Sequence, residues 1–566
     1  MLPVLPKVTK LQNKKIDSFG GIDRREGAKA NTFSELRGVD NVGGMSLETG
    51  NSFKCAVTQF NIQSDDLIFV DNDKEGKDAF YLGEGGFYKN GNLLPFKITN
   101  SNIDLEWLSK YTKNLSLSEN GKSEWQGEFR HTKLIRYDGC IFAVPQMIYT
   151  DGNNTFLWNK FSVGSANANN TSVSGGILKI EVSASWRKSV FGKFKPGEYL
   201  EIFIDETKLS GQFVMKVNTD NYVEIKCVKS NGNNYMASDF GFVVGKSFTI
   251  AVRVKDLPDF ADADVIYNRM WGVSGNRVYA SQLAQPFIFN EGEGTESDAW
   301  WADTEDREDF TAMASLNGRV IAFKRNSAYE IYGTVNPYTI KDTSRSMGCV
   351  CSASLKEVNG TLFLLSGEGI NVYGGSKFIN INESLCTDDV QVKGICKGSK
   401  YYALLSDGVY KYDYYSGLWT GVTDMKFTGL TDIDFDVFGI TDNGKLVQLT
   451  GEKKEFLEYG DDICREWMVE SAAIGAADFY AEGINKLELR FESEEKGKIS
   501  VEVSRDSGGF EKCGEFETGE GWQIFSVPIS FIPCSTFRYR IKGTGKMRLR
   551  LISYSFRKGG TANRYE

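Results

Sequence analysis

A short run of apolar or alternating residues recurs through the middle of this chain, and this repetition limits the fold more than any other feature. Each copy follows a Gly, Asn or Asp turn, and successive copies begin 42, 42, 39 and 36 residues apart; they are residues 277–281, 319–323, 361–365, 400–404 and 436–440. A period near 40 residues made of strands and turns is typical of β-propeller blades with about four strands each. Because one blade cannot bury both of its faces, several blades must pack around a common axis.

The repeat divides the chain into five expected regions. Two earlier runs, residues 66–70 and 140–144, resemble the repeats and bring the expected number of blades to about seven. We predict an all-β protein with a β-propeller, an inserted small β-barrel or sandwich domain and a C-terminal β-sandwich. The regions are an irregular N-terminal arm (1–54), a first propeller segment (55–155), the insert (156–256), a second propeller segment (257–460) and the C-terminal sandwich (461–566).

The insert and the C-terminal domain are predicted from strand alternation. Residues 211–217 and 222–227 flank an Asn218-Thr-Asp-Asn turn and alternate apolar with polar positions, which indicates a β-hairpin. Residues 487–491 and 499–503 alternate in the same way, as strands with one buried face do. Both ends of an inserted domain must lie close together, which a loop between two strands permits.

Composition places the chain among globular proteins. It is 41% hydrophobic and 13% aromatic, and its 59 Gly against 10 Pro suit many tight turns. No segment approaches the roughly 20 apolar residues of a membrane helix, and the N-terminus lacks the apolar core of a signal peptide. We therefore expect no membrane segment and synthesis in a cytoplasm. The ten Cys are scattered without a zinc-binding spacing, so no metal is expected.

Charge is distributed unevenly along the chain. The net charge is −9, but residues 1–29 carry +4 and residues 538–566 carry +8, which leaves −21 for the rest. An acidic body with basic ends can assemble head to tail, whereas the alternative is two solvated basic termini. In a predicted hairpin, alternation would gather one basic patch of assembly contacts: Arg538, Arg540, Lys542, Arg548 and Arg550. Deleting residues 1–29 or neutralising Arg538, Arg540 and Lys542 should then impair assembly rather than folding.

Known catalytic patterns are scarce in this sequence. His131 is the single histidine, which leaves no second imidazole for a zinc hydrolase, and no nucleophile elbow or phosphate-binding loop is present. We therefore assign no catalytic, cofactor-binding or metal-binding residue. Paired carboxylates remain a rival, because a glycosidase needs two acids about 5–9 Å apart. The densest acidic tract, residues 291–309, is interpreted as a loop or protomer contact, with a cation or ligand site as alternatives; its candidate contacts are Asp298, Trp300, Trp301 and Asp303.

The order of these regions resembles that of the tail nozzle proteins of tailed bacteriophages, also called tail tubular protein B. The opening Phe19-Gly-Gly-Ile-Asp and the Asn-rich segment after it are similar to the start of that family. The middle is more specific, and its segments resemble the family's blade series: residues 276–281, 316–324, 328–333, 348–354 and 359–373. The C-terminal domain carries the least resemblance.

The resemblance implies a structural virion protein that is not an enzyme and uses no cofactor. Such proteins form a ring, usually a homohexamer, that continues the DNA channel below the portal and adaptor and helps retain and then release the genome. The protein would be made in the bacterial host cytoplasm and reside in the virion tail. An acidic body suits a channel in which DNA must slide without sticking. The alternatives are a tail-tip propeller that binds or hydrolyses host-surface glycans and a host-encoded scaffold.

Overall fold

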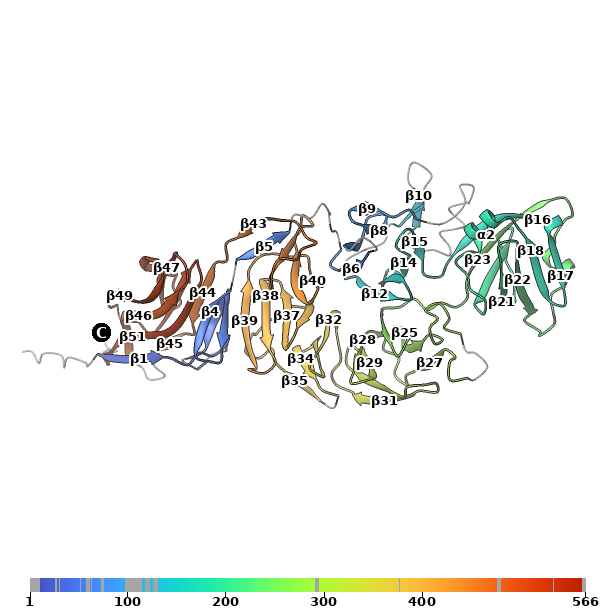
Figure 1. The fold of residues 1–566 in the computed structure, drawn as a ribbon. Helices are drawn as coiled ribbons and strands as arrows, with labels where there is room; N and C mark the ends of the chain where they lie inside the picture. Colours follow the sequence, from blue (N-terminus) through green and yellow to red (C-terminus); the bar gives the residue numbers. More distant parts are fainter. Residues whose placement is uncertain are drawn as a thin grey trace, which may run out of the picture. The chain divides into compact units, whose positions relative to one another are not determined.

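The computed structural model describes residues 11–25, 28–29, 31–50, 52–56, 62, 64–72, 76–96, 115–117, 123–125, 131–290, 295–375, 377–475, 480–532 and 534–561. The chain forms two compact units, one of residues 59–355 and one of residues 1–58 with 356–566. Strands dominate both units (Figure 1). No helix among the described residues is long and apolar enough to span a membrane.

Residues 59–355 contain four antiparallel sheets of four strands each, the blades expected from the repeat. The first two are β6 (Leu67–Asp71), β7 (Lys77–Gly83), β8 (Gly86–Lys89) and β9 (Asn92–Leu93), then β12 (Lys133–Tyr137), β13 (Cys140–Val144), β14 (Ile148–Thr150) and β15 (Thr155–Leu157). The next two are β24 (Asp262–Ile266), β25 (Arg269–Ser274), β26 (Arg277–Ala280) and β27 (Trp300–Asp303), then β28 (Phe310–Leu316), β29 (Arg319–Lys324), β30 (Ala328–Tyr332) and β31 (Thr339–Ser344). A separate pair joins β10 (Leu115–Leu117) to β11 (Ser123–Trp125).

The inserted domain is one antiparallel sheet in the order β16-β23-β19-β21-β22-β18-β17, with β20 paired to β19. Its elements are β16 (Ser162–Asn167), η1 (Ala168–Asn170), β17 (Thr171–Ser174), β18 (Ile177–Glu181), α2 (Ala184–Val190), β19 (Tyr199–Ile204), β20 (Thr207–Lys208), β21 (Gly211–Asn218), β22 (Tyr222–Lys229), η2 (Ala237–Phe240) and β23 (Ser247–Val254). The entry strand β16 pairs with the exit strand β23, Ser162 opposite Val252, so the two ends of the insert lie side by side. The expected small β domain is therefore built on one sheet, whose order begins with β16 and ends with β17.

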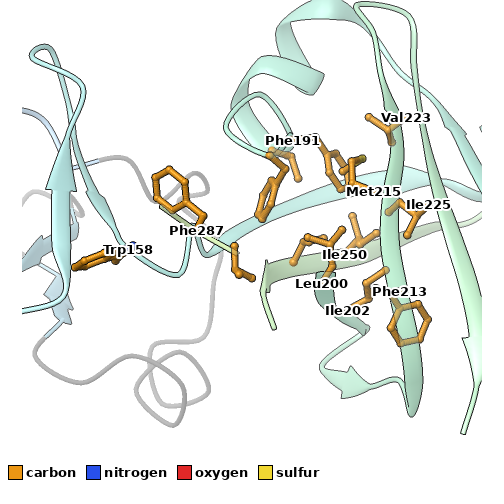
Figure 2. Packing of buried hydrophobic residues seen from close by; sticks show 14 of the residues in the cluster. Trp158, Phe191, Leu200, Ile202, Phe213, Met215, Val223, Ile225, Ile250 and Phe287 are labelled. Carbon is orange, nitrogen blue, oxygen red and sulfur yellow. The ribbon is translucent and has the colours of Figure 1, made fainter. Parts of the chain in front are cut away.

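One apolar core fills the insert and continues into the neighbouring blade. In the expected hairpin, Phe213 lies opposite Cys227 and Met215 opposite Ile225, and all four side chains are buried. Figure 2 shows Phe213, Met215 and Ile225 among the strands of the insert, with Trp158 and Phe287 toward the blade. The Trp158 and Phe142 ring centroids are 4.6 Å apart, which ties the insert's entry to β13.

The second unit contains three further blades, so the described residues include seven in all. The boundary between the units falls within β32. The first two are β32 (Cys351–Val358), β33 (Thr361–Ser366), β34 (Gly369–Tyr373) and β35 (Phe378–Asn380), then β36 (Lys393–Lys397), β37 (Lys400–Leu405), β38 (Gly408–Asp413) and β39 (Leu418–Thr423). The last is β40 (Gly429–Ile433), β41 (Asp436–Ile440) and β42 (Leu446–Gln448), completed by β5 (Phe53–Ala56) and β43 (Tyr459–Ile463).

Two sheets pack face to face in the C-terminal domain, as expected for a β-sandwich. One holds β1 (Gln12–Ile16), β3 (Val39–Val42), β4 (Ser46–Thr49), β46 (Tyr480–Ser493), β49 (Gly521–Pro528) and β51 (Met547–Thr561). The other extends the sheet of β39 through β2 (Phe33–Arg37), β44 (Trp467–Ser471), β45 (Ile474–Gly475), β47 (Gly497–Arg505), β48 (Glu511–Thr518) and β50 (Thr536–Gly543). Leu489 and Val501 are fully buried, and Phe537 meets Tyr554 at 5.8 Å between ring centroids. The expected all-β architecture, propeller with inserted and C-terminal β domains, is confirmed.

The N-terminal segment differs from the expected irregular arm. Its described residues supply five strands to the second unit: β1, β3 and β4 join the β51 sheet, β2 joins β39 and β44, and β5 completes the last blade. Residues 1–10 lie outside the described residues. Phe19 and Ile22 are buried, and Arg24 donates to Glu35 at 2.7 Å. Removing residues 1–29 would therefore disturb folding, because it takes away a strand and buried side chains.

We predict that Phe53→Ala destabilises the second unit by about 3–5 kcal/mol, the usual loss for emptying a buried aromatic site. Phe53 is 4% exposed on β5, packs in a cluster with Leu430 and Val447, and has the Arg465 guanidinium 5.0 Å from its ring centre. Urea unfolding followed by tryptophan fluorescence measures the loss. The control Phe435→Ala, at an 86% exposed turn position of the same unit, should change stability by less than about 0.5 kcal/mol. Equal effects would contradict the role of β5.

Candidate functional site

The four predicted contacts of the acidic tract do not converge on one site. Trp300 packs between blades, with ring centroids 6.0 Å from Trp271 and 5.3 Å from Tyr338. Trp301 is the next residue on β27 and so points to the opposite face, where the Arg277 guanidinium lies 3.7 Å from its ring centre. Asp303 accepts two hydrogen bonds from Arg277, at 2.5 and 2.7 Å. Both tryptophans are therefore structural rather than sugar platforms.

Asp298 holds a turn. Its carboxylate accepts from the Thr295 amide at 2.7 Å, and its carbonyl accepts from the buried Arg269 guanidinium at 2.7 Å. Glu291 and Glu293, at the start of the same tract, lie outside the described residues.

Beside Asp303 an open cleft of about 730 Å³ is lined with carboxylates: Asp303, Glu305, Asp306, Glu308 and Asp342. Asp306 pairs with the Lys324 ammonium and accepts from the Tyr329 hydroxyl at 2.5 Å. Burial opposes ionisation, but these two hydrogen bonds hold the pKa of Asp306 below its usual value. The hydrogen bond from Arg277 likewise lowers the pKa of Asp303. A glycosidase general acid needs a raised pKa, so neither carboxyl suits that role. No group of potential metal ligands occurs among the described residues.

The predicted basic patch is divided between two sheets and largely neutralised. Residues 543–545 cross from β50 to β51, which belong to different sheets of the sandwich, rather than forming a hairpin. Arg538 and Arg540 pair with Glu470 at 3.0 and 2.7 Å, and Lys542 pairs with Glu502 at 3.3 Å.

In the other sheet, Arg548 pairs with Glu48 at 2.5 Å, and Arg550 is half-buried with its Nε atom buried. The single basic patch expected from the sequence is therefore wrong, because alternation sets the face of a strand but not the sheet to which the strand belongs.

A second cavity, also of about 730 Å³, combines cations with aromatic rings; we call it the lysine pocket. It lies in the first unit between the blade β12–β15 and the segment of the insert that follows β18. Its cations are Lys160, Arg187, Lys188, Lys193 and Lys195.

Local sequence explains how the insert presents these cations. Ser183 caps α2 by accepting a hydrogen bond from the Trp186 amide at 3.3 Å, which starts the helix that carries Arg187 and Lys188. After the helix, Phe191 and Phe194 are buried in the insert's core. The intervening Lys193 and the following Lys195 are thereby left at the pocket.

The floor of the pocket holds a buried ion pair. Lys160, 1% exposed, pairs with Glu198, 0% exposed, and its ammonium lies 3.7 Å from the centre of the Phe287 ring. Burial lowers the pKa of Lys160, while the carboxylate of Glu198 opposes that change. The second oxygen of Glu198, Oε2, has no hydrogen-bond partner.

Lys193 is a second cation of the pocket whose pKa is lowered. Its ammonium donates to the Phe161 carbonyl at 2.8 Å and lies 5.2 Å from the centre of the Phe156 ring. Burial, with a smaller contribution from the nearby Lys160, lowers the pKa of Lys193 to about 7. Strongly perturbed groups in a cavity are frequent at functional sites.

The remaining cations differ in their neutralisation. Lys195 pairs with Asp138 at 3.0 Å, and Arg187 pairs with Asp220 at 2.6 Å. Lys188 is exposed and has no carboxylate partner among the described residues, and neither has Lys193.

Three aromatic rings also line the pocket, and we call them the aromatic wall. Tyr149 stacks on Phe156 with centroids 5.0 Å apart and meets Phe287 edge-on at 5.1 Å. Phe156 is partly exposed, whereas the other two are buried. Burial raises the pKa of the Cys140 thiol to about 11, so this lining residue is not a thiolate nucleophile near neutral pH.

Sequence reasoning missed the lysine pocket. Four of its cations fall within residues 187–195, a visible local excess of positive charge in an otherwise acidic body. Lys160 and the aromatic wall come from strands and loops far away in the chain, so only the fold brings them together.

No protein-family model matches this chain, and no curated protein matches it. Among solved structures the chain is similar to an exo-β-1,3-galactanase from Phanerochaete chrysosporium with galactose (9% identity, 78% of this chain and 99% of that one, TM-score 0.17). It is similar to a family 43 arabinoxylan arabinofuranohydrolase from Bacillus subtilis (9% identity, 96% of this chain and 96% of that one, TM-score 0.15). It is also similar to TmCBM61 in complex with β-1,4-galactotriose (16% identity, 17% of this chain and 64% of that one, TM-score 0.14). The last match therefore spans less than two thirds of that protein.

These structures are glycoside hydrolases and a glycan complex, and they contradict the expectation that the chain is not an enzyme. We correct that expectation and leave enzymatic activity open. At these identities and TM-scores the likenesses transfer no activity, substrate or residue role to this chain.

We predict that Lys160→Met destabilises the first unit by about 3–5 kcal/mol, because it leaves the Glu198 carboxylate buried without its partner. The double variant with Glu198→Leu should recover most of this loss, since both charges are then gone. Chemical unfolding of the single and double variants measures the coupling. The control Lys179→Met removes an exposed pair with Glu181 at 3.1 Å and should cost no more than about 1 kcal/mol. A double variant as unstable as Lys160→Met would refute the coupling.

Proposed function

We propose that this protein is a glycan-binding propeller of a tailed-phage tail, and that its lysine pocket takes up saccharides of the host surface. The observation that carries the proposal is the lysine pocket itself, where aromatic rings and hydrogen-bonding side chains converge in about 730 Å³. Ligand pockets typically measure about 300–1,000 Å³ and combine an apolar wall with a few placed polar groups.

The chemistry of the lining suits a sugar. The C–H face of a pyranose is apolar and packs on an aromatic ring such as Phe156, which is partly exposed. Sugar hydroxyls both donate and accept hydrogen bonds, and the pocket offers both types, with ammonium donors and the carboxylates of Asp138 and Asp151. Asp151 already accepts from the amides of Asn153 and Asn154, at 2.9 and 2.8 Å, so its orientation is set in advance.

The location in a phage tail rests on the sequence resemblance. The resembling segments fall in order on β26, on β28 and β29, on β30, on β32, and on β33 with β34, so they follow successive blades. A virion protein at a tail tip would meet the host surface directly, and we propose the virion tail as its place of action.

A ring-forming nozzle is the second candidate function, favoured by the same resemblance and by the acidic body of the chain. In that case the protein would assemble as a homohexamer with the portal, the adaptor and other tail proteins, and genomic DNA would pass through it. Class averages of the purified protein by electron microscopy test this candidate. A ring with an axial channel near the ~20 Å width of duplex DNA supports the nozzle, and a stable monomer contradicts it.

We predict that Phe156→Ala lowers saccharide affinity at least tenfold without unfolding the protein, because the ring contributes the open side of the aromatic wall. Isothermal titration with host-surface oligosaccharides measures the affinity, and released reducing ends report any hydrolysis in the same samples. Tyr415→Ala, at a 79% exposed position of the other unit, is the control and should bind as the wild type does. If no oligosaccharide binds, or if the two variants lose affinity equally, the proposed function is wrong.

A further inference from the structure

We propose that the ligand of the lysine pocket is an anionic saccharide, whose acidic group binds between Lys188 and Lys193 while its ring packs on the aromatic wall. This inference rests on the proposed function and adds the charge of the ligand to it. The acidic group is a sugar carboxylate or a sugar sulfate, which share the chemistry that two ammonium groups recognise.

The charge balance of the pocket is the first step. Three of its five cations have a carboxylate partner in the protein, namely Lys160 with Glu198, Lys195 with Asp138 and Arg187 with Asp220. Lys188 and Lys193 have none among the described residues, and the hydrogen-bond partner of Lys193 is a neutral carbonyl. The Asp151 carboxylate also lines the pocket, so one net positive charge is left there, and an anionic ligand would neutralise it.

The contrast with the acidic cleft is the second step. There Asp303 and Asp306 are each paired with a cation of the chain, and Asp342 is paired with Arg345. Glu305 and Glu308 of the same cleft form no ion pair among the described residues, so the unpaired groups there are negative, whereas the unpaired groups of the lysine pocket are positive. Excess positive charge inside a concave, partly apolar site raises the local concentration of anions.

The position of Lys193 is the third step. Its ammonium lies near the Lys160 ammonium and among aromatic side chains, an environment that disfavours its charge in the empty pocket. A bound anion reverses that balance, because an opposite charge within about 4–6 Å favours the charged form of a group. Ligand binding and proton uptake by Lys193 are therefore coupled.

The neighbouring aromatic wall separates a saccharide from a free inorganic anion. Phe156 and Tyr149 form a stacked pair beside the Lys193 ammonium, and a bare sulfate or phosphate would leave this apolar surface uncovered. A saccharide with an acidic substituent uses both halves of the site.

Titration calorimetry on the whole chain tests the inference with four probes: a glucuronic acid trisaccharide, the matched glucose trisaccharide, a sulfated glucose trisaccharide and inorganic sulfate. We expect at least one acidic trisaccharide to bind ten times more tightly than the neutral one, and the two acidic probes distinguish carboxylate from sulfate. Lys188→Gln and Lys193→Gln should each lower acidic-trisaccharide affinity at least tenfold and lower neutral-trisaccharide affinity by a smaller factor, because the glutamine amide still donates hydrogen bonds to sugar hydroxyls. Lys216→Gln, an exposed position on β21 outside the pocket, is the matched control and should change neither.

The pH dependence gives an independent readout. Binding that requires the protonated ammonium should weaken as pH rises through the pKa of Lys193, about 7, by up to about thirtyfold between pH 6 and 8.5. The other charged and titratable residues that line the pocket are Asp138, Cys140, Tyr149, Asp151, Lys160, Arg187, Lys188 and Lys195. Burial raises the pKa values of Cys140 and Tyr149, so neither titrates in this range. The Lys193→Gln variant should lose the dependence.

The outcomes separate this inference from the proposed function. Equal affinity for acidic and neutral trisaccharides, or unchanged acidic-trisaccharide affinity in Lys188→Gln and Lys193→Gln, overturns the anionic ligand and leaves saccharide binding standing. Binding of none of the trisaccharides overturns both. Inorganic sulfate bound as tightly as the acidic trisaccharides overturns the role of the aromatic wall.

Discussion

A buried ammonium group anchors the region of this protein that carries its candidate site. Lys160 connects β15 to β16 and is enclosed by the Glu198 carboxylate and the Phe287 ring. Removing a charge from water costs several kcal/mol, which only a close partner offsets, so the chain around Lys160 must keep all three groups together. These groups come from the insert's entry, from the start of β19 and from the segment after β26. Their meeting sets the floor of the lysine pocket and the place at which the insert meets its blade.

Two cavities of equal volume illustrate how pairing of charges decides what a site can do. In the acidic cleft, hydrogen bonds from Arg277 and Lys324 lower the pKa values of Asp303 and Asp306. These carboxyl groups therefore stay ionised, which opposes proton donation. In the lysine pocket, burial and the nearby Lys160 ammonium lower the pKa of Lys193, and no carboxylate among the described residues pairs with it. A group held near its titration point in a partly apolar cavity responds to whatever binds there. This difference directs attention from the carboxylates of the acidic tract to the lysines of the pocket.

Most of the fold could be predicted because the signals are local. The turns and the placement of Phe213 and Met215 on one face of their strand depend on residues within one hairpin, and the structure confirms them. The blade period likewise depends on short strands and the turns between them. The errors concern pairing between distant strands. The N-terminal segment looks irregular in the sequence, yet its strand β5 pairs with β42 in the last blade. The basic residues of β50 look unpaired in the sequence, yet Arg540 forms an ion pair with Glu470 on the neighbouring strand. The candidate site shares this property, since its lysines are clustered in sequence but its aromatic wall is not.

The sequence by itself determined that the protein is built from β-sheets, that blades repeat through its middle, and which residues of each strand face the core. Those properties follow from side-chain alternation and turn chemistry, which act over a few residues. The tertiary structure alone decided which strands share a sheet, which charges neutralise one another and which remain without a partner. Such pairings depend on contacts between residues more than a hundred positions apart, as for Lys160 and Phe287, and no local pattern encodes them.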